Sequence, residues 1–149
     1  MLKWALAFSL MATMAGSNGF AEEFVRVEAE GSVPEVVERF VATVEGAGAT
    51  VFAQVNHGAG AAAVDMPIPD SVLVIFGNPQ LGTPALAADP RAGVVLPLRV
   101  LVHDEGGQTV LSYQSVDALF ETLDVPGDAA VRTAMEGALS RLTTAAATR

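Results

Sequence analysis

Val72-Leu-Val-Ile-Phe-Gly-Asn-Pro-Gln-Leu-Gly-Thr83 is an apolar strand sequence that runs directly into a turn and the start of a helix. Residues 72–76 are apolar on both faces, as in strands covered on both sides, so we expect this strand to be central in a sheet. Asn is favoured as a helix cap and Pro at the first helical position. Asn78 and Pro79 therefore predict a short helix over residues 80–88.

A second strand follows over residues 96–103, and its alternation predicts two different faces. One face carries Leu96, Leu98, Val100 and Val102, and the other carries Pro97, Arg99, Leu101 and His103. The acidic, glycine-containing turn at 104–107 leads back into a strand over 109–113. This arrangement predicts a β-hairpin.

The remaining elements follow from periodicity and capping signals. Ser32 and Glu35 have the spacing of a capping box, with Pro34 in the first turn, and the helix that they begin ends at the glycines at 46 and 48. Strands are also expected over 24–29 and 50–56, and helices over 115–123 and from a cap at Asp128 onward. Residues 57–63 are small and fit either a short helix or a loop.

This order of strands and helices predicts one α+β domain over residues 22–149, with a single sheet that carries its helices mainly on one face. Before it, Lys3 precedes an apolar run of about a dozen residues and a small, polar stretch that ends at Ala21. That layout predicts a secretory signal peptide over residues 1–21, and hence a periplasmic or secreted protein. A retained signal-anchor is the alternative, although the run is shorter than the roughly 20 residues of a membrane span.

Charge and cysteine content exclude several classes of function. Without Lys3, 7 basic side chains face 17 acidic ones, a net charge of −10 for residues 22–149. Such a chain repels nucleic-acid phosphates and anionic lipids, so we expect neither as a partner. With 0 cysteines, thiol catalysis, iron–sulfur clusters and covalent c-type haem are ruled out. We expect no cofactor and no metal site, because a metal needs three or four converging ligands.

Two segments carry a family resemblance: Ile75-Phe-Gly-Asn-Pro79 with Gly82-Thr83 after it, and Leu96-Pro-Leu-Arg-Val-Leu-Val102. They resemble the family called domain of unknown function 302 over roughly Val33 to Phe120. The resemblance implies a curved, mostly antiparallel sheet similar to TATA-binding-protein-like folds. Family members often have Asp-His where this chain has Asn56-His57, and Asp where it has Val95, so a function that needs that second acid would be absent here.

The strand-to-helix turn supplies the first candidate ligand site. Gly77, Asn78 and Thr83 lie in a G-x-x-x-x-G-T spacing that lacks the Lys of a phosphate loop, which argues against nucleotides. Free N–H groups at a helix start nevertheless suit an anion or a carboxylate. The structural alternative is a tight turn with a helix cap and no ligand.

The second group of candidates is His57, Arg99 and Tyr113. His57 ends a strand and matches the family resemblance. Arg99 and Tyr113 lie on neighbouring expected strands, and we predict that they share one sheet face as a carboxylate pocket. The alternative is a solvated strand face.

These residues support three functional hypotheses. The leading one is a non-enzymatic exported module that binds a small molecule or a periplasmic protein, with a homodimer through the sheet edge or face as a further expectation. The second is an enzyme with His57 as acid or base and with Asn78 and Arg99 orienting a carboxylate-bearing substrate. The third is weak metal or haem binding by His57.

Overall fold

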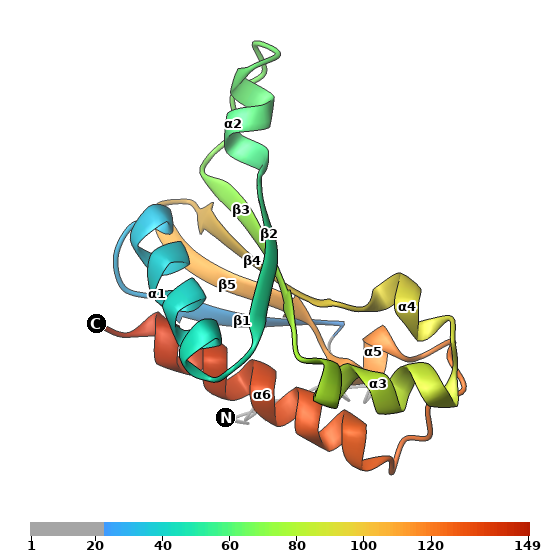
Figure 1. Cartoon of the computed structure of the whole chain (residues 1–149). Helices are drawn as coiled ribbons and strands as arrows, with labels where there is room; N and C mark the ends of the chain where they lie inside the picture. Colours follow the sequence, from blue (N-terminus) through green and yellow to red (C-terminus); the bar gives the residue numbers. More distant parts are fainter. Residues whose placement is uncertain (1–22) are drawn as a thin grey trace, which may run out of the picture.

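The computed structural model describes residues 23–149 and contains one sheet of five antiparallel strands in the order β1-β5-β4-β3-β2 (Figure 1). The strands are β1 (Phe24–Ala29), β2 (Thr50–Asn56), β3 (Ser71–Gly77), β4 (Leu98–Glu105) and β5 (Gln108–Gln114). The α+β class with a single sheet is confirmed, and every strand pair is antiparallel. The expected signal peptide lies outside the described residues.

Six helices complete the described chain, and the two longest lie on the same face of the sheet (Figure 1). They are α1 (Val33–Gly46), α2 (His57–Ala62), α3 (Pro79–Ala88), α4 (Ala92–Val95), α5 (Val116–Leu119) and α6 (Ala130–Ala147). α1 and α6 cover the sheet, whereas α2 projects away from it beyond the ends of β2 and β3. Along the described residues, no helix combines the length and apolarity needed to cross a membrane.

The core forms between the sheet and the apolar stripes of α1 and α6. Val36, Phe40 and Val44 recur at helical spacing on α1 and are completely buried. The rings of Phe40 and of Phe76 from β3 pack edge to face, with centroids 5.4 Å apart and planes at 82°. This edge-to-face arrangement is favourable for aromatic pairs, so it fixes how α1 lies on the sheet. Met135 on α6 extends the same core.

The helix caps and the hairpin turn, which depend on contacts within a few residues, are confirmed. The Glu35 carboxylate accepts the backbone N–H of Ser32 at 2.7 Å, as the capping box predicts. Asn78 Oδ1 accepts the N–H of Gln80 at 2.9 Å and caps α3. In the β4–β5 hairpin, Gly106 and Gly107 have φ angles of 65° and 95°, and a side chain would strain both positions.

Two expectations about strands were wrong. The sequence of residues 50–56 predicts Val51, Ala53 and Val55 on one side of the strand. The register instead shifts between Val51 and Ala53, so Val51 pairs with Phe76 while Ala53 pairs with Ile75. Phe52 is the extra residue at this irregularity, so Val51 and Ala53 lie on opposite sides of the sheet. β3 does have a neighbour on each side, but the central strand of the sheet is β4.

The remaining differences concern element ends. β4 begins at Leu98 rather than at residue 96, because α4 occupies residues 92–95 directly before it. α5 is shorter than expected, and the residue at the N-cap of α6 is Ala129 rather than Asp128. Residues 57–62 form a helix, which settles the ambiguous segment.

Truncation of Phe40 tests the core. Phe40→Ala removes a ring with 0% exposure, so we expect the free energy of unfolding to fall by about 3–5 kcal/mol. Phe24→Ala is the matched control, because that ring is 56% exposed, and we expect a change within about 0.5 kcal/mol. Urea unfolding measures both values, and equal losses in the two variants would contradict this account of the core.

Candidate functional site

Two hollows lie on either side of the start of β4. The first, which we call the apolar hollow, has a volume of about 280 Å³. It is bounded by Phe52, the turn after β3, helices α3 and α4 and one residue of α6. Its lining residues are Phe52, Gly77, Asn78, Pro79, Leu81, Gly82, Thr83, Leu86, Gly93, Leu96, Pro97, Leu98 and Met135.

The apolar hollow contains three of the residues that the sequence singled out: Gly77, Asn78 and Thr83. The side-chain oxygen of Asn78 is already occupied by the Gln80 N–H, so it serves as a helix cap. A Cβ atom at Gly77 would lie 3.4 Å from the Phe52 ring, so any side chain there would take space from the hollow. The turn therefore shapes a largely apolar cavity, which the G-x-x-x-x-G-T spacing did not predict.

The second hollow, which we call the split hollow, has a volume of about 320 Å³ and contains the other three candidates, His57, Arg99 and Tyr113. Its residues come from both faces of the sheet. The lining is Phe24, His57, Leu73, Leu98, Arg99, Leu101, Ser112, Tyr113, Gln114, Leu119 and Leu139.

The split hollow exists because two neighbouring strands stop pairing before they end. The β4–β5 pairs finish at Leu101 with Ser112, although β4 starts at Leu98 and β5 continues to Gln114. Beyond that point β4 still pairs with β3, and β5 still pairs with β1. The strands thus separate, and residues from the helix-covered side and from the opposite side line one hollow.

Arg99 differs from most other arginines of the described chain. Arg26, Arg91, Arg132 and Arg149 each form an ion pair with a carboxylate. Within residues 23–149, the bond found for the exposed Arg99 side chain runs from Nη2 to the carbonyl oxygen of Val95, at 3.1 Å. Among the described residues that line the split hollow, none is acidic. The guanidinium charge is therefore not neutralised by a carboxylate in this part of the chain.

His57 is the first residue of α2 and lies at the end of β2. The Asn56 side chain accepts the N–H of Ala59 at 2.8 Å and caps this helix. Asn and Asp are comparable N-caps, so the departure from the Asp-His pattern preserves the local geometry. His103, the other histidine, lies outside both linings and has its Nε2 3.0 Å from Ser112 Oγ.

The prediction that Arg99 and Tyr113 share one sheet face was wrong. Leu101 pairs with Ser112, so Ser112 lies on the side of Arg99, while Tyr113 belongs to the core on the helix side. Burial raises the pKa of the Tyr113 hydroxyl, and a hydrogen bond with the Thr143 side chain of α6 partly offsets that rise. Both residues line the split hollow only because the strands separate there.

The structure brings some candidates together and keeps others apart. His57 and Arg99 share the split hollow, whereas Asn78 lies in the apolar hollow, so the three residues of the enzyme hypothesis do not line one cavity. Within residues 23–149, no three His, Asp or Glu side chains are placed to hold a metal ion. Sequence reasoning missed Ser112 and Gln114, because nothing local marks where two strands separate.

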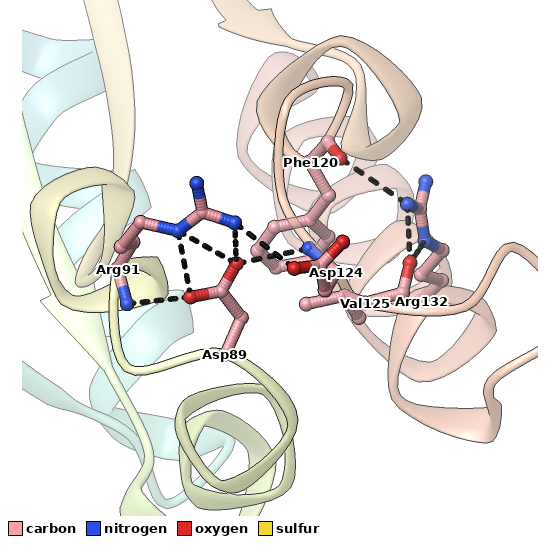
Figure 2. Close-up of polar contacts among 6 residues, drawn as sticks. All are labelled: Asp89, Arg91, Phe120, Asp124, Val125 and Arg132. Carbon is pink, nitrogen blue, oxygen red and sulfur yellow. Dashed lines mark hydrogen bonds and ion pairs between the residues drawn. The ribbon is translucent and has the colours of Figure 1, made fainter.

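The buried carboxylate of Asp89, between α3 and α4, binds the segment that follows α5 (Figure 2). Arg91 Nη2 donates to Asp89 Oδ2 at 2.7 Å, and the Asp124 N–H donates to the same oxygen at 2.9 Å. These bonds, led by that of the Arg91 side chain, hold the pKa of Asp89 well below its ordinary value of 3.8. Nearby, Arg132 donates to the carbonyl of Val125 at 2.6 Å, so the segment after α5 is tied to both α4 and α6.

Comparison with known proteins supplies the family and the fold. A family model described as "Domain of unknown function DUF302" matches residues 25–146, which is more than the part carrying the sequence motifs. A crystal structure of an uncharacterized conserved DUF302 protein from Bacillus stearothermophilus has a TM-score of 0.78 and 19% identity. It covers 85% of this chain and 99% of that one.

Curated relatives match over a shorter stretch. Proteins named fluoride-specific ion channel FluC 1, from Brucella suis and Brucella abortus, are 41% identical over 86 residues, or 58% of this chain. The aligned stretch covers 34% and 32% of those proteins, so the chain spans about a third of the length of these relatives.

Neutralising Asp89 tests the anchor beside the apolar hollow. A carboxyl group with a depressed folded pKa contributes stability above its ordinary pKa, and this contribution is lost as the pH falls. We therefore expect Asp89→Asn to lower the melting temperature by several degrees at pH 7, with a difference from wild type that shrinks between about pH 4 and pH 2.

Thermal melts over a pH series measure this effect. Asp128→Asn removes the same charge from an exposed carboxylate and is the matched control. A melting temperature of Asp89→Asn equal to that of wild type at pH 7 would show that the anchor contributes no stability.

Proposed function

The chain belongs to the DUF302 family, and we propose that this member is a non-enzymatic binding module for a small organic carboxylate. The observation that carries the proposal is the split hollow, which combines Arg99 with a lining that has no acidic residue among the described residues. The chain as a whole has 17 acidic residues and 8 basic ones, so a lining with one arginine and no described acidic residue has the opposite charge balance. It supports an anionic ligand over a cationic one.

The geometry favours a carboxylate in particular. A guanidinium offers parallel N–H donors that match the two oxygens of a carboxylate, and such charge-assisted bonds are stronger than neutral ones. Arg99 uses Nη2 to donate to the Val95 carbonyl, which holds the side chain in place and leaves other donors for a ligand. His57 and Gln114 also line this hollow and supply further polar groups.

The apolar walls favour an organic anion over a simple ion. Phe24, Leu73 and Leu101 line the split hollow beside Arg99. A volume of about 320 Å³ lies within the range of small-molecule sites, which begins at roughly 300 Å³. Although the curated relatives are named for fluoride, a single ion would leave most of this volume unfilled.

The enzyme hypothesis with His57 as acid or base is the second candidate. The observation that favours it is that His57 and Arg99 line the same hollow. Asn78 has no part in it, because this side chain lines the apolar hollow and caps α3. An enzyme would therefore depend on His57 and Arg99 alone among the residues first considered.

Replacement of Arg99 tests the binding function. We expect butyrate to bind the purified protein, and Arg99→Ala to weaken it roughly 10-fold to 100-fold, since hydrogen bonds to charged groups contribute about 1.5–3 kcal/mol. Arg99→Lys keeps the charge without the paired donors, so its affinity should be intermediate. Chemical-shift titration by NMR measures all three affinities.

Arg141→Ala is the matched control, because it removes the same charge from an exposed position on α6. Butyramide, phosphate and fluoride are the competing probes, and we expect each to bind more weakly than butyrate. The same butyrate affinity in Arg99→Ala and wild type would refute the carboxylate site.

We also propose that the protein is exported and that residues 1–21 are removed. In a bacterial host, the intact mass of the purified protein should correspond to a chain that begins at Glu22. Ala21→Arg places a large charged residue immediately before the cut and should block cleavage. A wild-type protein that retains Met1 would contradict this proposal.

A further inference from the structure

We propose that the ligand is amphipathic, with its carboxylate on Arg99 in the split hollow and an apolar chain in the apolar hollow. The inference rests on the proposed carboxylate site and adds the class of ligand: a medium-chain aliphatic carboxylate. It assigns the apolar hollow to the aliphatic chain of the ligand, whereas the proposed function involves the split hollow alone.

The two hollows share a lining residue at the start of β4. Leu98 lines both of them, and Arg99 is the next residue along the strand. The Arg99 guanidinium reaches back to the carbonyl of Val95, the last residue of α4. Val95 directly precedes Leu96, which lines the apolar hollow. The cationic group thus lies at the border between the hollows, where the head of an amphipathic ligand would bind.

The apolar hollow has the chemistry of a site for an aliphatic chain. Its described lining contains no charged residue. Of its polar side chains, Asn78 is occupied as a helix cap. Leu81, Leu86, Leu96 and Met135 supply branched or flexible apolar walls. Apart from Thr83, the lining offers few partners to a polar ligand, and a buried polar group without a partner is costly.

The volume of the hollow sets the size of the chain. A dry apolar cavity of about 150 Å³ binds benzene, so a hollow of about 280 Å³ accommodates a body of roughly ten carbon atoms. Each methylene transferred from water contributes about 0.8 kcal/mol, which corresponds to roughly fourfold in affinity. Affinity should therefore rise with chain length until the hollow is full.

Gly82 offers a way to fill the hollow without disturbing the fold. It lies within α3, and a Cβ atom there would meet only Leu96 Cδ1, at 3.9 Å. Gly82→Leu therefore places a side chain into the hollow at a position where a helix tolerates it well. Gly46→Leu is the matched control, since it makes the same change at the end of α1, where a Cβ meets nothing within 4 Å.

The experiment compares butyrate, octanoate and octan-1-ol on the purified protein by isothermal titration and NMR. We expect octanoate to bind on the order of 100-fold more tightly than butyrate, from the contribution of four further methylenes. Gly82→Leu should abolish most of this gain and leave butyrate within about twofold of wild type, while Gly46→Leu changes neither. Arg99→Ala should weaken the binding of both butyrate and octanoate, and octan-1-ol should bind less tightly than octanoate.

Direct contact provides a readout that does not depend on the variants. The terminal methyl group of octanoate should give nuclear Overhauser effects to the methyl group of Met135, which lines the hollow, and none to the exposed Met66. The inference would be overturned if octanoate bound no more tightly than butyrate, or contacted Met66 instead of Met135. The proposed function would still hold in that case if Arg99→Ala weakened the binding of butyrate. If Arg99→Ala binds butyrate and octanoate as tightly as wild type, both this inference and the proposed function are overturned.

Discussion

The burial of one sheet face beneath α1 and α6 is the constraint on which the rest of this structure depends. Phe40, Phe76 and Met135 belong to this layer and are almost wholly removed from water. The chain has no cysteine to reinforce the fold, so this apolar contact supplies the main stabilisation. It also fixes the position of β3 and β4, and with them the turn and the strand start that shape both hollows.

The candidate site arises where regular structure stops. β4 and β5 separate beyond the Leu101–Ser112 pair, toward the start of β4 and the end of β5. The sheet therefore opens between two strands that remain paired to their outer neighbours. Arg99 and Tyr113 come from opposite faces and line one hollow for this reason. A continuous ladder would have closed the hollow and left Arg99 on a solvated strand face.

Charge gives this opening its chemical character. Most basic side chains of the described chain are used in ion pairs, including Arg91 with the buried Asp89. Within residues 23–149, Arg99 instead donates to the main-chain oxygen of Val95 and forms no ion pair with a carboxylate. An acidic protein thereby presents a positive group between two apolar-walled hollows, which is the basis of the proposed carboxylate ligand.

The sequence by itself determined the elements whose signals are local. The Ser32 and Glu35 capping box, the Asn78 cap and the glycine hairpin at 106–107 depend on contacts within a few residues, so their chemistry can be identified without the fold. The tertiary structure alone decided that Tyr113 faces α6, that Phe52 interrupts the alternation of β2 and that β4 separates from β5. Strand register and strand separation depend on packing between segments far apart in the chain, and a single sequence carries no local mark of either.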